Sequence, residues 1–237
     1  MTRTVLITGT EDSTGKTAIA LALGKRARAA GKSVGYMKPK GTRLQSNVGK
    51  TIDEDPLLAR EVLGLDAEMH ELEPIVYSPT FVEEAIRGRE DPEELRETVR
   101  ENFEALSAER DLMLIEGASS LDTGGIVDLT DADLAALLDA EVVLIAPYGS
   151  ARDTDTVLAA ADRLGERLSG VVFNAVADAS FDSLESDVVP FLEDRGIPVL
   201  GVLPRTQELA GVTVAELADE LGAELLTSAA TDEFVER

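Results

Sequence analysis

The chain has 237 residues, 44% of them hydrophobic, and its 46 acidic against 22 basic residues give a formal net charge of -24. This length and apolar content exclude a disordered chain and are ample for a folded core. The negative charge argues against nucleic acid and anionic membrane surfaces as partners, and the absence of cysteine excludes disulfides, thiolate metal sites and a cysteine nucleophile.

Short apolar runs alternate along the chain with amphipathic segments. The runs predict buried strands at residues 4–7, 33–37, 111–115, 141–146, 170–173 and 198–202. The amphipathic segments predict helices at residues 17–30, 55–63, 91–108, 131–138, 154–164 and 181–195. This alternation predicts an α/β doubly wound domain with a mostly parallel sheet, in which functional groups gather at the carboxyl ends of the strands.

We place the domain at residues 1–204 and a C-terminal extension at residues 205–237. In the extension we expect a helix at 214–221, a strand at 224–226 and the start of another helix within 231–237. Two interpretations stay open, because the last helix has little chain to pack against. The extension is either the start of a truncated second domain or an ordinary C-terminal helix with a frayed end.

The acidic residues are spread along the whole chain, and only 6 of the 22 basic residues are lysine. This pattern favours a halophilic protein, because concentrated salt screens the self-repulsion of an acidic surface. The alternative is simply a protein of low isoelectric point. With no signal peptide and no apolar run of membrane-spanning length, we expect a cytoplasmic location.

A phosphate-binding loop follows the first predicted strand and opens the first predicted helix. It consists of Gly9, Thr10, Glu11, Asp12, Ser13, Thr14, Gly15, Lys16 and Thr17, a Walker A pattern with one extra residue between its glycines. Glycines let the backbone N–H groups converge on phosphate oxygens, Lys16 reaches the β- and γ-phosphates, and Thr17 offers a hydroxyl to Mg²⁺. The loop therefore predicts nucleotide binding.

This loop resembles that of dethiobiotin synthetase, the related cobyrinic acid amide synthetases, and the N-terminal domain of phosphotransacetylases. Four further segments resemble that superfamily in the same order, at residues 36–39 (YMKP), 53–59 (DEDPLLA), 114–118 (LIEGA) and 170–174 (GVVFN). The resemblance covers about residues 1–204 and implies a P-loop NTPase fold that binds ATP and Mg²⁺. Residues 38–42 (KPKGT), 204–205 (PR) and 211–217 (GVTVAEL) most resemble archaeal phosphotransacetylase-family proteins with a DRTGG domain.

The resemblance implies that Thr17, Asp55 and Glu116 surround Mg²⁺. Asp53 is an alternative to Asp55, and Asp55 is alternatively the N-cap of a helix that begins at Pro56. A carboxylate directly after an apolar strand, as at Glu116, is otherwise costly to bury.

Lys16 and Lys38 are the catalytic candidates, because a cation beside the phosphates stabilises a phosphoryl group as it moves. Lys40 is a weaker candidate, since its spacing places it on the opposite side of a continuing strand. The resemblance further implies that Asn174 contacts adenine and that Pro204 and Arg205 close over the base.

Three functions remain open at this stage. The first is a Mg·ATP-binding domain that senses nucleotide, hydrolyses ATP or activates a small carboxylate for attack by an amine. The second is dethiobiotin synthetase itself, which Lys40 and the Ser119–Ser120 pair count against, because the family favours glycine at the latter. The third is a regulatory module that binds nucleotide without turnover. The family resemblance also implies a homodimer, with residues 73–87 at its interface.

Overall fold

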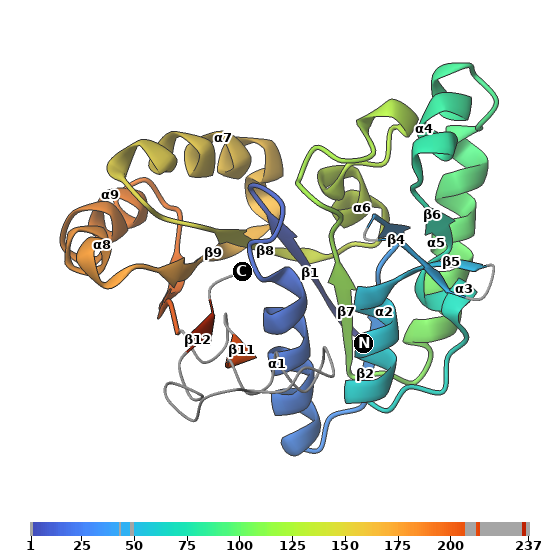
Figure 1. Ribbon diagram of the computed structural model, residues 1–237, viewed down its shortest axis with the longest axis horizontal. Coiled ribbons are helices and arrows are strands. Elements are labelled where there is room, and N and C mark those ends of the chain that lie inside the picture. Colours follow the sequence, from blue (N-terminus) through green and yellow to red (C-terminus); the bar gives the residue numbers. More distant parts are fainter. Residues whose placement is uncertain (1, 43, 48–49, 207–211, 214–233, 236–237) are drawn as a thin grey trace, which may run out of the picture.

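A computed structural model describes residues 2–42, 44–47, 50–206, 212–213 and 234–235. Its centre is a six-stranded sheet in the order β10-β9-β8-β1-β7-β2, and each neighbouring pair is parallel (Figure 1). The strands are β1 (Arg3–Gly9), β2 (Val34–Met37), β7 (Leu112–Glu116), β8 (Glu141–Ala146), β9 (Leu168–Val176) and β10 (Val199–Pro204). Each coincides with one of the predicted apolar runs, so the doubly wound α/β fold is confirmed.

Both faces of the sheet are buried, which explains why its strands are uniformly apolar. Successive side chains of a strand point to opposite faces. On β1, Leu6 therefore joins one hydrophobic cluster and Ile7 the other, and on β7 the same holds for Met113 and Leu114.

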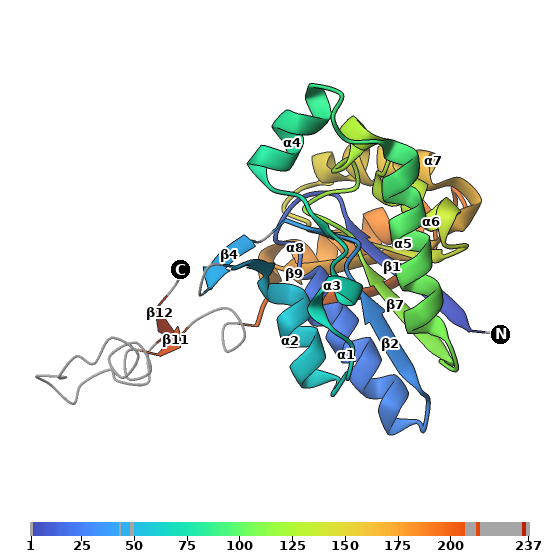
Figure 2. The ribbon, with the colours of Figure 1, turned by 90° about the vertical axis from the view of Figure 1, so that its right-hand side faces the viewer.

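Helices cover the two faces as the predicted alternation requires (Figure 2). Ala20 of α1 (Lys16–Ala29) and Ala59 of α2 (Glu54–Val62) lie in the cluster of Ile7. The cluster of Leu6 contains residues from other helices, among them α5 (Pro92–Ser107), α6 (Asp131–Leu137) and α7 (Thr154–Leu164). Short 3₁₀ turns lie at Gly125–Val127, Ala151–Asp153 and Gly165–Arg167.

The helix predicted at residues 181–195 is interrupted in the structure. It consists of α8 (Asp178–Ser183), a π-helical turn (Leu184–Val188) and α9 (Val189–Glu193). Pro190 follows the π-turn and has no N–H to donate to the preceding turn, so a regular α-helical ladder cannot pass through this point.

The chain between β2 and β7 holds elements that the sequence patterns did not predict. β3 (Lys40–Gly41) pairs in parallel with β6 (Ile75–Val76), and β4 (Leu44–Asn47) pairs antiparallel with β5 (Lys50–Asp53). The β4–β5 hairpin stands away from the sheet beside α2 (Figure 2). Two helices, α3 (Met69–Leu72) and α4 (Pro79–Ile86), complete this region.

Beyond residue 206, the C-terminal extension is described only at two short strands. β11 (Val212–Thr213) pairs antiparallel with β12 (Phe234–Val235), so residues 234–235 do not begin the helix expected there. Phenylalanine and valine both favour strands, and the pairing with Val212 and Thr213 outweighs the short helical pattern. The helix expected at 214–221 and the strand at 224–226 lie outside the described residues.

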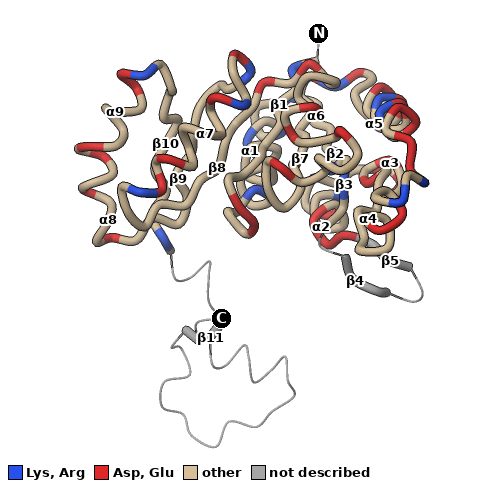
Figure 3. Tube along the Cα trace, turned by 90° about the horizontal axis from the view of Figure 1, so that it is seen from above, with Lys and Arg blue, Asp and Glu red and all other residues tan. Residues whose placement is uncertain are grey.

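The strand order reverses beside β1, whose neighbours are β7 on one side and β8 on the other. Ligands of open α/β sheets bind at the carboxyl ends of the strands next to such a reversal. Acidic residues outnumber basic ones along the outer helices α5, α8 and α9 (Figure 3). In the described ranges, no helix is long and apolar enough to cross a membrane.

Candidate nucleotide and magnesium site

The phosphate loop lies between the end of β1 and the start of α1, as the sequence predicts. Ser13 and Gly15 have positive φ angles of 55° and 89°. A Cβ atom on Gly15 would lie 2.3 Å from the Asn174 amide nitrogen, and one on Gly9 would lie 2.5 Å from the Thr14 hydroxyl oxygen. Close contacts therefore favour glycine at both positions, and at Gly15 the positive φ angle favours it as well.

The Lys16 ammonium group points across the loop toward the segment after β7. It donates to the carbonyl oxygens of Ser119 (2.9 Å) and Glu11 (3.2 Å). Burial lowers the pKa of Lys16, and Asp12 acts against that shift. Beside it, the Thr14 hydroxyl is buried and has no hydrogen-bond partner among the described residues. The unpartnered Thr14 hydroxyl can donate a hydrogen bond to a phosphate oxygen. The Lys16 ammonium group, now bound to two carbonyl oxygens, can do the same.

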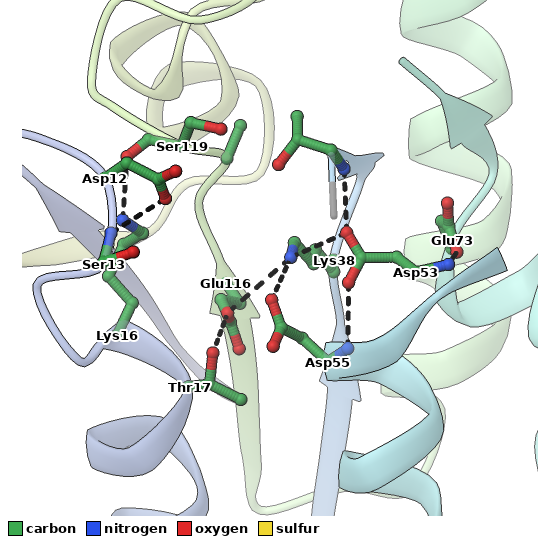
Figure 4. A network of polar contacts seen from close by, with 12 residues as sticks. Asp12, Ser13, Lys16, Thr17, Lys38, Asp53, Asp55, Glu73, Glu116 and Ser119 are labelled. Atoms are coloured by element: carbon green, nitrogen blue, oxygen red, sulfur yellow. Dashed lines mark hydrogen bonds and ion pairs between the residues drawn. The ribbon is translucent and has the colours of Figure 1, made fainter. Parts of the chain in front are cut away.

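Lys38 lies among three buried carboxylates (Figure 4). Its ammonium group forms ion pairs with Asp53 (2.9 Å), Asp55 and Glu116 (3.9 Å). Burial alone would lower the pKa of Lys38, but Glu116, Asp53 and Asp55 together outweigh it and raise that pKa. Lys38 therefore stays charged among these carboxylates.

Glu116 ends β7 and receives two hydrogen bonds through its two oxygens. Thr17 donates from its hydroxyl at 2.7 Å, and Tyr36 donates from its phenol at 2.8 Å. Burial raises the pKa of Glu116 to about 7, although Lys38 opposes the shift. Burial and the same carboxylate also raise the pKa of Tyr36 well above its usual value, so Tyr36 remains a donor.

Asp53, not Asp55, caps the helix that follows the hairpin. α2 begins at Glu54, and the Asp53 carboxylate accepts hydrogen bonds from the backbone N–H groups of Asp55 and Thr42, each at 2.8 Å. The alternative of Asp55 as N-cap is therefore wrong. Asp53 is fully buried beside Lys38, whereas Asp55 faces the pocket described next.

A pocket of about 490 Å³ unites most of the predicted site residues. Its lining consists of Asp12, Ser13, Thr14, Gly15, Lys16, Thr17, Ala18, Lys38, Thr42, Asp55, Glu116, Ala118 and Ser119. The ends of β1, β2 and β7 thus bring the phosphate loop, both lysines and the candidate magnesium ligands to one cavity.

The donor set at this pocket fits Mg²⁺. No group of three acidic or histidine side chains in the described part of the chain forms a closed metal cage. Mg²⁺ ordinarily takes one or two carboxylates and completes its shell with water and phosphate oxygens. The Asp55 and Glu116 carboxylates and the Thr17 hydroxyl are ligands of that kind on the wall of the pocket.

The residues predicted to contact adenine lie outside this lining. The side chain of Asn174 contacts the phosphate loop instead. Its amide nitrogen donates a hydrogen bond to the Thr14 carbonyl oxygen at 2.9 Å. Pro204 and Arg205 are exposed at the end of β10, and the Arg205 backbone N–H donates to Val176 of β9. Lys40 points away from the pocket, as its spacing suggested, and is fully buried elsewhere.

Several functional contacts escaped the sequence analysis. Tyr36 belongs to the YMKP segment, and the need of a buried phenol for a partner was its only signal. Thr42 reaches the pocket from an irregular segment. Asp131 begins α6 and reads as an ordinary acidic residue at a helix N-terminus, yet its side chain is fully buried.

Glu73 lies behind the Lys38 cluster, and its burial predicts a pH dependence of the free energy of unfolding. One of its carboxylate oxygens accepts from the Asp53 backbone N–H at 3.0 Å, and the other is buried without a partner among the described residues. Burial raises the pKa of Glu73 to about 7, from an ordinary value of 4.5. Between these values the folded chain binds a proton that the unfolded chain has released, so the free energy of unfolding falls as the pH rises.

Replacing Glu73 with glutamine is expected to reduce this fall, because the amide imitates the protonated acid. Urea denaturation at about pH 5 and about pH 8 measures the fall, on either side of the window in which the two states bind different numbers of protons. The exposed Glu104→Gln variant serves as control. An equal pH dependence in both variants would mean that Glu73 does not hold the extra proton.

Comparison with known proteins places these features in a family context. A family model described as an AAA domain matches residues 3–213. The chain is 31% identical to the ATP-dependent dethiobiotin synthetase BioD of Pseudomonas aeruginosa, over 90% of this chain and 94% of that protein. It is 26% identical to the protein of the same name from Methanococcus vannielii, over 84% of this chain and 92% of that protein.

Two further similarities are partial. The chain is 27% identical to the phosphate acetyltransferase of Haemophilus influenzae over 95% of its own length, but it spans only 34% of that protein. The signal recognition particle receptor FtsY from Elizabethkingia anophelis has a similar fold, with a TM-score of 0.52 and 15% identity over 85% of this chain and 58% of that one. The latter similarity concerns the fold alone.

Proposed function

The chain belongs to the AAA_26 family of AAA domains, within the dethiobiotin synthetase-like superfamily of P-loop ATP-binding domains, and we propose that it uses Mg·ATP to phosphorylate a small carboxylate. The observation that carries the proposal is the convergence of two ammonium groups on one pocket. Lys16 reaches it from the phosphate loop and Lys38 from the end of β2. Phosphoryl transfer requires such fixed positive charge more than it requires an acid or a base.

In this proposal the two walls of the pocket have different tasks. The backbone of the phosphate loop and Lys16 bind the β- and γ-phosphates, and the N-terminus of α1 adds a favourable dipole. Asp55, Glu116 and Thr17 hold Mg²⁺, which neutralises charge on the phosphate oxygens when it is bound. Lys38 stands opposite Lys16 and orients the acceptor carboxylate, with the Thr42 and Ser119 segments beside it.

The proposed reaction conserves all atoms and charge. A carboxylate oxygen of the acceptor attacks the γ-phosphorus, the bond from that phosphorus to the β–γ bridging oxygen breaks, and ADP leaves with the bridging oxygen. The product is an acyl phosphate. An amine then attacks its carbonyl carbon, the bond from that carbon to the phosphate oxygen breaks, and the released phosphate takes the proton that the amine nitrogen loses. Lys38 needs no proton transfer in the first step, in keeping with the carboxylates that hold it charged.

Hydroxylamine trapping tests the proposal, since hydroxylamine converts an acyl phosphate into a stable hydroxamate. The protein is incubated with Mg·ATP and a panel of mono- and dicarboxylates, and hydroxamate and ADP are measured together. The expected result is hydroxamate and ADP in equal amounts with at least one acid. ATP binding without any acid-dependent ADP release would favour the regulatory module instead.

A second candidate is dethiobiotin synthesis, which the 31% identity to a BioD protein of matching length favours. Ser119 and Ser120 stand where that family favours glycine, and this difference counts against it. An assay with diaminopelargonate and bicarbonate distinguishes the two. ADP release that depends on both compounds would identify the synthetase reaction.

Two further features belong to the proposal. The acidic surface suits a cytoplasm of high salt concentration, so the assays are best made in molar KCl. The chain is also proposed to pair as a homodimer through residues 73–87, where Ile86 at the end of α4 is 70% exposed. Sedimentation in molar KCl distinguishes the dimer from the monomer.

A further inference from the structure

Lys40 is a buried lysine that takes no part in the pocket. It stands two residues after Lys38, and its side chain is only 1% exposed. Its ammonium group donates to the carbonyl oxygens of Thr123 (2.6 Å) and Leu129 and pairs with the Asp131 carboxylate at 3.1 Å. All three of its donor positions are thus used, and the loop between β7 and α6 is folded around them.

Asp131 connects this ion pair to the ends of two central strands, β1 and β7, through contacts of its carboxylate. Its carboxylate accepts from the Thr8 hydroxyl at 2.6 Å and lies 3.4 Å from the Ala118 backbone nitrogen. A Cβ atom on Gly117 would come within 2.1 Å of the same carboxylate, so the backbone there fits closely against it. Thr8 directly precedes the phosphate loop, and Gly117 directly follows Glu116.

The two strand ends are also linked on the pocket side, through Lys16. Its ammonium group binds the Ser119 carbonyl at 2.9 Å, one residue after Ala118. A shift of residues 117–119 would therefore change where Lys16 points. Stability alone does not account for the Lys40–Asp131 pair, since apolar residues of similar volume commonly stabilise a buried site equally well.

We propose that Lys40 and Asp131 form a positioning pair that fixes the phosphate loop relative to residues 117–119 and so sets the position of Lys16 toward the γ-phosphate. Neither residue lines the pocket. The proposal rests on ATP binding at the pocket and extends it, because it assigns the strength of γ-phosphate recognition to an ion pair behind the site.

The test compares ATP and ADP affinities, since ADP lacks the group that the pair is proposed to control. Dissociation constants are measured by titration calorimetry for wild type, Lys40→Met, Asp131→Asn and the double variant, well below the melting temperature of each. Lys25→Met, on the exposed face of α1, is the matched control. A merely structural role would lower melting temperatures and leave the ATP-to-ADP affinity ratio unchanged.

Lys40→Met is expected to weaken ATP binding about tenfold more than ADP binding, the size of one misplaced charge-assisted hydrogen bond. Asp131→Asn keeps the size of the side chain and an acceptor for the Thr8 hydroxyl. If Lys40→Met does not fold, the ATP-to-ADP affinity ratio of Asp131→Asn tests the proposal. The double variant should have a higher melting temperature than the single variants, because no buried charge is left unpaired. Its ATP-to-ADP affinity ratio should still differ from that of wild type. A wild-type ratio in the folded single variants would overturn the proposal.

Hydrogen–deuterium exchange of the free protein separates this proposal from the proposed function. Faster exchange is expected at residues 8–17 and 117–124 in Lys40→Met and not in Lys25→Met. If wild type binds no ATP, the proposed function fails, and the exchange result still decides on the positioning pair. Unchanged exchange in both segments would overturn it.

Discussion

Replacing Lys16 with methionine is expected to weaken ATP binding about 100-fold, because charge-assisted hydrogen bonds to two phosphates are lost together. Lys16 lies on the wall of the pocket and is 7% exposed. In the free protein its ammonium group is held by the carbonyls of Ser119 and Glu11, so the group is already directed across the phosphate loop. Titration calorimetry in molar KCl measures the loss.

Lys25→Met provides the control, since it removes an exposed lysine from the same helix. This variant is expected to bind ATP as wild type does. Wild-type affinity in a folded Lys16→Met protein would contradict the assignment of the phosphate site.

Replacing Lys38 with methionine is expected to lower the free energy of unfolding by about 3–5 kcal/mol, the cost of breaking a buried ion pair on one side. Lys38 is 2% exposed and pairs with Asp53, Asp55 and Glu116, which are themselves buried. Methionine fills a similar volume but leaves these carboxylates without their ammonium partner. Chemical denaturation without divalent cations measures the change.

Mg²⁺ provides a second and sharper comparison for Lys38→Met. A divalent cation bound by Asp55 and Glu116 would replace part of the missing charge, so Mg²⁺ should stabilise this variant more than wild type. The Lys25→Met protein should respond to Mg²⁺ as wild type does. An equal response in all three proteins would contradict the placement of the metal at these carboxylates.

The sheet could be predicted from the sequence because burial on both faces leaves a local signal. The runs at residues 141–146 and 111–115 are apolar after their first, acidic residue and lie within one residue of β8 and β7. The β4–β5 hairpin gave no such signal. β4 reads Leu-Gln-Ser-Asn, with neither alternation nor β-branched residues, and its pairing with β5 is a tertiary outcome.

The site likewise has residues that the sequence predicts and contacts that it does not. Lys16, Lys38 and Glu116 follow predicted strands, so the ends of those strands place them together. Whether Asp53 or Asp55 caps α2 depends on the residue at which that helix begins. Helix boundaries are poorly defined by sequence. The bond from Thr8 to Asp131 joins residues 123 positions apart, and no local pattern reports a contact of that range.

The most direct test of a Mg·ATP site at the end of β1 is titration of the full chain with ATP in molar KCl, with and without Mg²⁺. One ATP is expected to bind per chain, and Mg²⁺ should strengthen the binding, because Asp55, Glu116 and Thr17 face the same pocket as Lys16. Absence of binding by well-folded protein, or binding that Mg²⁺ leaves unchanged, would contradict a Mg·ATP site at the end of β1.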